Sequence, residues 1–129
     1  MSARRLLLLP LLSLAWSLTA PAGPAGAAEL VMFREDGCPY CKEWEEDVGA
    51  VYPMTEEAAI APLRRVDIHD PAPEIELDGA IRYTPTFVLV EDGQEIDRIT
   101  GYPGEEVFWW MLGGMLERLT PTIHEEDSS

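Results

Sequence analysis

Residues 29–51 read ELVMFREDGCPYCKEWEEDVGAV: an apolar run, a short break with glycine, a Cys-Pro-Tyr-Cys step and a mostly charged segment. The run Glu29–Phe33 predicts a buried strand, because its apolar residues follow one another without interruption. Beyond it, apolar residues recur at the spacing of one helix face: Cys41, Trp44, Val48 and Val51. Pro39 falls in the first turn of that helix, where proline is tolerated best. The segment therefore predicts a strand, a tight loop and a helix that begins at the cysteines.

The rest of the chain adds strands and helices in a simple order. Three further strands are predicted from short apolar or alternating runs: Leu63–His69, Thr86–Val90 and Glu95–Thr100. Glu91–Gln94 predicts a hairpin turn between the last two. Helices are predicted at Thr55–Ala61 and Glu105–Leu119, whereas Glu74–Ala80 is ambiguous and can be read as a short helix. The order β-α-(α)-β-(α)-β-β-α predicts an α/β domain with a mixed central sheet of about four strands flanked by helices.

The first 28 residues have the three parts of a secretory signal peptide. Arg4 and Arg5 give a basic start, residues 6–20 form a leucine-rich apolar run, and residues 21–28 are small. An uncleaved membrane anchor is the alternative, but the run is shorter than the roughly 20 residues that a spanning helix needs. We predict a cleaved signal peptide at 1–28, one domain at 29–120 and an acidic flexible tail at 121–129.

The charge of the chain limits its partners. The chain contains nine Lys and Arg residues and 24 Asp and Glu residues, and loss of residues 1–28 would leave a formal charge of −17. Nucleic acid and anionic membranes repel such a domain, so we expect neither as a partner. The acidity favours solubility, with steering toward a basic partner as the alternative.

Cys38 and Cys41 are the two cysteines of the chain, and their spacing favours a redox-active pair. Only a thiolate attacks a disulfide, and the unpaired N–H groups at a helix N-terminus stabilise a thiolate. The two-residue spacer lets the second thiol reach back to the first. We predict that Cys38 is the exposed nucleophile and Cys41 the buried resolving thiol.

Three other interpretations of the pair remain open. A zinc or copper site would need further ligands, which His69 and His124 could supply. A structural disulfide that closes so short a loop removes little entropy from the unfolded chain. The spacing can also be accidental. We expect no metal and no cofactor.

Three segments resemble the thioredoxin superfamily: Val31–Phe33, then Cys38–Lys42 opening a helix, and Ile81–Thr86 opening a strand. The Cys-Pro-Tyr-Cys motif is the glutaredoxin form, with Pro39 and Tyr40 as the spacer that tunes the redox potential. The resemblance implies that Pro85 is cis and faces the cysteine pair, and that Thr84 presents its backbone to a substrate chain as to an added strand. A trans-proline at a strand start is the alternative.

More narrowly, the signal peptide, the segment Phe33–Lys42 and the segment Gly101–Leu112 resemble the SoxS family, the periplasmic thioredoxins of bacterial sulfur-oxidising (Sox) systems. This resemblance implies a monomeric periplasmic enzyme that reduces a cysteine disulfide on a partner protein, the sulfur-carrier pair SoxYZ. A membrane thiol transporter would supply the electrons. The alternatives are a cytochrome c maturation reductant, a general disulfide oxidase or isomerase, and a metal-binding module.

The chain departs from ordinary thioredoxins at two positions. Met32 stands where the superfamily has a buried acid, so a proton acceptor for Cys41 is either missing or comes from elsewhere, with Glu35 and a water as the candidates. Gly37 replaces the usual tryptophan and opens the approach to Cys38. Glutathione binding is not implied, since no basic cluster for its carboxylates is evident.

Two further features of the sequence lie away from the cysteines. Trp109–Leu112 make one turn of the last helix apolar nearly all round, which predicts core packing, with one exposed tryptophan as the alternative. His69 is expected at the surface.

Overall fold

The computed structural model describes residues 27–70, 72 and 74–120. Four strands form one sheet in the order β2-β1-β3-β4: β1 (Ala28–Arg34), β2 (Leu63–Asp67), β3 (Thr86–Glu91) and β4 (Gln94–Thr100). β2 runs parallel to β1, whereas β3 pairs antiparallel with both β1 and β4. The predicted mixed sheet is confirmed. Most of the predicted signal peptide and all of the predicted tail lie outside the described residues.

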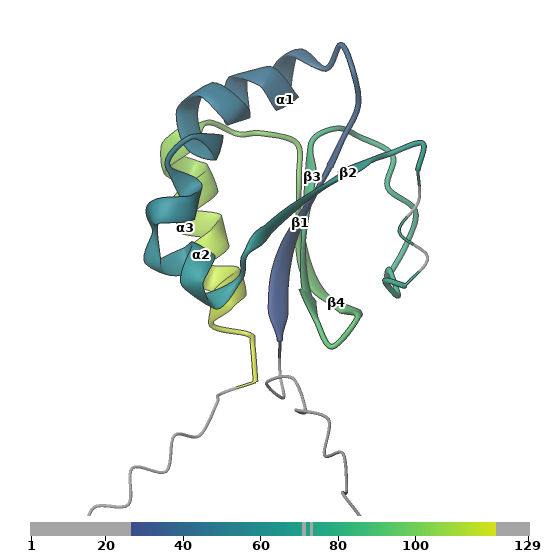
Figure 1. Cartoon of the computed structure of the whole chain (residues 1–129), viewed down its shortest axis with the longest axis vertical. Helices are drawn as coiled ribbons and strands as arrows, with labels where there is room; N and C mark the ends of the chain where they lie inside the picture. The colour runs from purple at the N-terminus through teal and green to yellow at the C-terminus, as the bar shows by residue number, and fades with distance from the viewer. Residues whose placement is uncertain (1–26, 71, 73, 121–129) are drawn as a thin grey trace, which may run out of the picture.

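The helices gather on one side of the sheet (Figure 1). They are α1 (Pro39–Trp44), which continues into a π-helical turn η1 (Glu45–Gly49), then a 3₁₀ turn η2 (Tyr52–Met54), α2 (Glu56–Ile60) and α3 (Glu105–Leu116). The Thr55 hydroxyl accepts a hydrogen bond from the N–H of Ala58 and so caps α2 at the predicted start. Within the described part of the chain, no helix is both long and apolar enough to cross a membrane.

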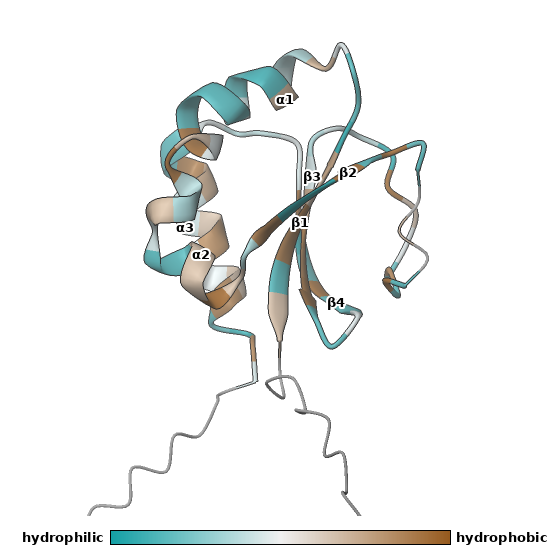
Figure 2. Cartoon of the chain, viewed as in Figure 1, coloured by the Kyte–Doolittle hydropathy of each residue, from teal (hydrophilic) through white to brown (hydrophobic). Residues whose placement is uncertain are grey.

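Both faces of the sheet are buried, which explains the uninterrupted apolar runs of the central strands. Leu30, Met32 and Phe87 point to the helices, whereas Val31 and Val88 point to the connection between β2 and β3. The apolar residues of these central strands line the middle of the molecule (Figure 2). Each fully buried aliphatic or aromatic side chain stabilises the fold by about 1.5–3 kcal/mol.

The helix after the cysteines changes register at its π-helical turn. Cys41, Trp44 and Val48 are buried as predicted, but Val51 is 41% exposed, so its predicted place in the core is wrong. A π-helical turn holds more residues than an α-helical turn, which rotates the following residues around the helix axis. Tyr52 takes the core position instead, and its hydroxyl donates a hydrogen bond to the carbonyl of Ala61 at 2.7 Å.

The connection between β2 and β3 contains no helix at residues 74–80, so the short-helix interpretation is wrong. Glu76 instead bridges to Gln94 at the start of β4, and its N–H donates to the carbonyl of Gly93 at 2.8 Å. The alternation of Ile75 and Leu77 with acidic residues is a strand pattern, and both apolar side chains pack against the second face of the sheet. An irregular segment therefore covers this face.

The hairpin between β3 and β4 is confirmed, with positive φ at Asp92 and Gly93. Its register shifts between Leu89 and Val90. This irregularity explains why the apolar residues of β4 alternate imperfectly in the sequence.

Candidate active site at the cysteine pair

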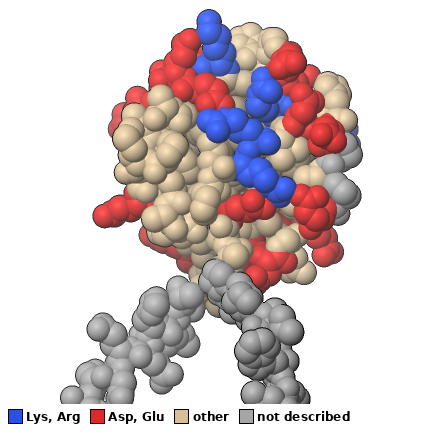
Figure 3. Space-filling view, in the orientation of Figure 1, with Lys and Arg blue, Asp and Glu red and all other residues tan. Residues whose placement is uncertain are grey.

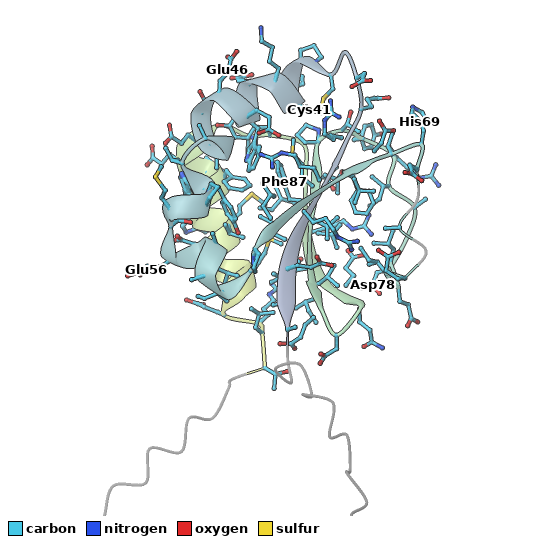
Figure 4. The ribbon with its side chains drawn as sticks, viewed as in Figure 1. Cys41, Glu46, Glu56, His69, Asp78 and Phe87 are labelled. Carbon is cyan, nitrogen blue, oxygen red and sulfur yellow. A yellow bond between two sulfur atoms is a disulfide. The ribbon has the colours of Figure 1, made fainter. Side chains whose placement is uncertain are left out.

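Cys38 and Cys41 form a disulfide with a Cα–Cα distance of 5.3 Å. Cys41 is 3% exposed and belongs to the core between the helices and the sheet, close to Phe87 (Figure 4). Cys38 is partly exposed. The burial of the two cysteines thus differs in the direction that we predicted for an attacking and a resolving thiol.

The backbone around Cys38 places its sulfur at the start of α1. Gly37 has a φ of 79°, a conformation that favours glycine and turns the chain after β1. Cys38 is the N-cap, Pro39 begins the helix, and the N–H of Cys41 donates a hydrogen bond to Sγ of Cys38 at 3.1 Å. In the reduced protein this N–H would stabilise the thiolate of Cys38 over its thiol.

Pro85 enters β3 through a cis peptide bond with Thr84, as the resemblance implied. Phe33 near the end of β1 pairs with Thr86, the residue after Pro85. The loop that carries Cys38 starts at this end of β1. The sheet register therefore places Thr84 and Pro85, just before β3, at the same end of the central strands as the loop that carries Cys38.

Glu35 links three loops next to the disulfide. The hydroxyl of Thr84 donates a hydrogen bond to Oε1 of Glu35 at 3.0 Å, and Nε2 of His69 lies 3.3 Å from Oε2 of the same carboxylate. His69 is exposed, as expected. These contacts leave no pattern in the sequence, because Thr84 and His69 lie 49 and 34 residues away from Glu35.

A pocket of about 530 Å³ opens beside the disulfide. Both cysteines line it, together with residues from the end of β1 and the first turns of the helix: Arg34, Glu35, Gly37, Pro39, Lys42 and Glu45. Arg34, Lys42 and Glu45 were not among the predicted site residues. Tyr40 of the spacer does not line the pocket and is 60% exposed.

Met32 is fully buried among apolar side chains, so the position of the superfamily's acid holds no carboxylate here. Tyr102 donates a hydrogen bond to Oδ2 of Asp47 at 2.9 Å. Burial and the carboxylate of Asp47 raise the pKa of Tyr102 above its ordinary value, so this donor stays protonated at neutral pH.

The metal-site interpretation finds no support in the part of the chain that the structure describes. Within those residues, no group of three or more His, Cys, Asp and Glu side chains is arranged to hold a metal ion. His69 contacts Glu35, and His124 lies outside the described residues.

The two tryptophans of α3 lie in different environments: one packs against a core side chain and the other is exposed. Trp109 stacks on the ring of Tyr52 with the centroids 6.0 Å apart, whereas Trp110 is 78% exposed. Core packing is therefore wrong for Trp110, which fits the alternative of one exposed tryptophan.

A Cys-x-x-Cys disulfide at the start of a helix, beside a cis-proline that enters a strand of a four-stranded mixed sheet, defines a thiol–disulfide oxidoreductase of the thioredoxin type. The family model described as a thioredoxin-like domain matches residues 19–115, and the chain belongs to this family. It is similar to the periplasmic thioredoxin SoxS from Paracoccus pantotrophus in its reduced form, with 40% identity and a TM-score of 0.68 over 70% of this chain and 97% of that one.

Two more distant thioredoxins share the fold. The thioredoxin Mala s 13 of Malassezia sympodialis is 21% identical, with a TM-score of 0.58 over 71% of this chain and 80% of that chain. The thioredoxin of Fasciola hepatica is 23% identical, with a TM-score of 0.52 over 70% of this chain and 83% of that chain. No curated protein matched the chain.

Proposed function

We propose that this protein is an exported, periplasmic thiol–disulfide oxidoreductase that reduces a disulfide on a partner protein. The observation that carries the proposal is the asymmetry of the pair: Cys38 is partly exposed at the pocket and Cys41 is buried behind it. The first thiol is accessible to a partner, whereas the second is accessible mainly to the first.

The reaction is two successive thiol–disulfide exchanges. The Cys38 thiolate attacks one sulfur of the partner disulfide, a Cys38–partner bond forms, and the second partner sulfur leaves as a thiolate. The Cys41 thiolate then attacks Sγ of Cys38 and releases the first partner sulfur as a thiolate. Two electrons pass to the partner, and the Cys38–Cys41 disulfide is restored. Because the periplasm is oxidising, a membrane thiol transporter must reduce the pair again.

The neighbours of the pair have supporting roles in this proposal. Thr84 and Pro85 hold the partner as an extended segment, bound by main-chain hydrogen bonds like an added strand. Pro39 and Tyr40 tune the redox potential. Pairs of the glutaredoxin type lie at roughly −200 to −230 mV, above roughly −270 mV for thioredoxin.

We assign the sulfur-carrier pair SoxYZ as the partner. The similarity to SoxS over nearly all of that chain supports this choice, and so do the sequence features of the segment 1–28 that indicate export. A reductant for cytochrome c maturation and a general disulfide oxidase are the other roles open to the same chemistry.

Trapping the mixed disulfide tests the proposal. In the Cys41→Ser variant the second exchange cannot occur, so we expect a covalent Cys38–SoxYZ adduct on non-reducing gels, identified by mass spectrometry. Cys38→Ser is the matched control and should trap nothing. A Cys41→Ser variant that traps neither SoxYZ nor any other periplasmic protein would contradict the mechanism. An adduct with another protein would contradict only the partner.

A further inference from the structure

We propose that the pocket beside the disulfide selects partner disulfides that carry an acidic group next to the cysteine, although the protein itself is strongly acidic. This inference rests on the proposed reduction of a partner disulfide and names the class of substrate. It follows from the side chains that share the pocket with Cys38.

Two cations line the pocket, and their own partners hold them only weakly. Nη2 of Arg34 lies 3.0 Å from Asp36, whose side chain is 95% exposed. Nζ of Lys42 lies 3.7 Å from Glu46 in a pair whose side chains are 79% and 66% exposed. Exposed ion pairs contribute about 0–1 kcal/mol, so an incoming anion can replace either carboxylate with little loss.

The two carboxylates that line the same pocket are already engaged. Glu45 accepts two hydrogen bonds from Arg65, at 2.6 and 2.7 Å, and this bidentate ion pair neutralises its charge. Glu35 accepts the Thr84 hydroxyl and contacts His69. An anion in the pocket therefore meets two replaceable cations, one carboxylate that Arg65 neutralises, and Glu35, whose hydrogen-bond donor Thr84 carries no charge.

Basic side chains also lie on the surface around the pocket. Figure 3 shows Lys and Arg side chains in a band over α1 and β2, with acidic side chains on both sides. These elements and the end of β1 carry four of the seven basic residues that follow the predicted signal peptide: Arg34, Lys42, Arg64 and Arg65. Arg34 and Lys42 line the pocket at the disulfide, whereas Arg64 and Arg65 lie outside the pocket lining and are paired with carboxylates.

The net charge of the chain disfavours anionic substrates at long range, whereas the pocket favours them at short range. The charge of the whole chain repels an anion at a distance, but salt at physiological ionic strength screens exposed charges beyond about 8 Å. A group bound against Arg34 and Lys42 lies within that range. The pocket therefore decides selectivity under physiological conditions.

Three small symmetrical disulfides that differ mainly in charge test this inference. The reduced full-length protein is mixed with 3,3′-dithiodipropionate (anionic), bis(2-hydroxyethyl) disulfide (neutral) or cystamine (cationic). In each reaction the dithiol is oxidised to the Cys38–Cys41 disulfide and one small disulfide becomes two thiols. Each rate constant is divided by that for free dithiothreitol with the same disulfide, which corrects for the leaving thiol.

We expect the normalised rate at physiological salt to be highest for the anionic disulfide and lowest for cystamine. Replacing Arg34→Gln and Lys42→Gln together should lower the rate with the anion about threefold to tenfold more than the rate with the neutral disulfide, which reports any change in the reactivity of Cys38 itself. Arg118→Gln removes one positive charge just after α3, at a residue that does not line this pocket, and should behave like the wild type. Peptide disulfides with aspartate or lysine beside the cysteine should rank in the same way.

A wild-type preference for cystamine would overturn the inference, and so would an anion preference that survives the double substitution. The neutral disulfide serves as the internal control for folding and thiol reactivity. A protein that none of the three disulfides oxidises would instead contradict the proposed redox function, on which the inference depends.

Discussion

Glu35 has two candidate roles at the active site. As a base it would accept the proton of Cys41 in place of the acid that Met32 replaces. As a positioning residue it would hold the hydroxyl of Thr84, which lies 3.0 Å from Oε1, and so fix the loop before the cis-proline. Glutamine separates these roles, because its amide oxygen still accepts a hydrogen bond but does not take up a proton at neutral pH.

We predict that Glu35 is a positioning residue. Glu35→Ala and Thr84→Val should each raise KM for the protein substrate by about fivefold with kcat nearly unchanged, and the double variant should add little further. Glu35→Gln should stay close to the wild type, as should His69→Ala. Steady-state kinetics across pH provides the measurement. A Gln variant as impaired as the Ala variant, with an altered pH profile, would instead assign the proton acceptor to Glu35.

Gly49 lies at a position where the packing leaves little room for a side chain. A Cβ at this position would collide with the carboxylate of Glu45 and lie 3.1 Å from Cζ3 of the fully buried Trp44. We expect Gly49→Ala to lower the free energy of unfolding by about 1–3 kcal/mol, because the tryptophan ring cannot move away within the packed core.

Gly113 of α3 is the matched control for Gly49, since a Cβ there meets nothing within 4 Å. Gly113→Ala should raise the free energy of unfolding by about 0.5–1 kcal/mol, because alanine favours the helix. Urea denaturation of both variants compares the two effects. Equal effects of the two substitutions would contradict the steric role of Gly49.

At the scale of elements, β4 holds the irregular connection that covers one face of the sheet. Glu95 accepts the N–H of Asp78 at 2.8 Å and Nη2 of Arg98 at 2.6 Å, and Nη2 of Arg98 also donates to the carbonyl of Gly79 at 3.1 Å. Burial alone would raise the pKa of Glu95, but the hydrogen bonds from Arg98 and Asp78 outweigh it and hold the pKa below its usual value.

This lowered pKa makes part of the stability depend on pH. The unfolded chain takes up the proton first as pH falls, so the contribution of Glu95 is present above pH about 4.3 and is lost as pH falls through the lower folded pKa. Glu95→Gln should therefore be less stable than the wild type at pH 7, with a difference that shrinks in acid. Urea denaturation from pH 7 to 3 measures it. A difference that stays constant over this range would contradict the assignment.

The elements that could be predicted from the sequence are those with local causes. β1, the hairpin and the start of α1 follow from short apolar runs, a glycine turn and a proline in the first helical turn. The register change at the π-helical turn and the bridge of Glu76 to Gln94 could not be predicted, because both depend on packing with distant elements. The same holds for the pocket, whose charges depend on pairs such as Glu45 with Arg65, 20 residues apart.

At the scale of the whole molecule, the class of protein could be predicted from the sequence, but the distribution of charge over the surface could not. The motif at residues 38–41 and the proline at 85 predicted the thioredoxin-like fold, which the structure and the family match confirm. Composition gives only a strongly negative total. Figure 3 shows basic side chains lying together over α1 and β2 on one face of the molecule, an arrangement that depends on the fold.

The outer strands of the sheet bear on how the protein behaves at high concentration. β2 and β4 form its two borders, and both carry charged side chains: Arg64, Arg65 and Asp67 on one, Glu95, Asp97 and Arg98 on the other. Charges on border strands discourage a second chain from extending the sheet, which is how many proteins avoid fibril growth. We expect the sheet to resist self-association at both borders, so that the protein stays free of sheet-extended assemblies when it is concentrated.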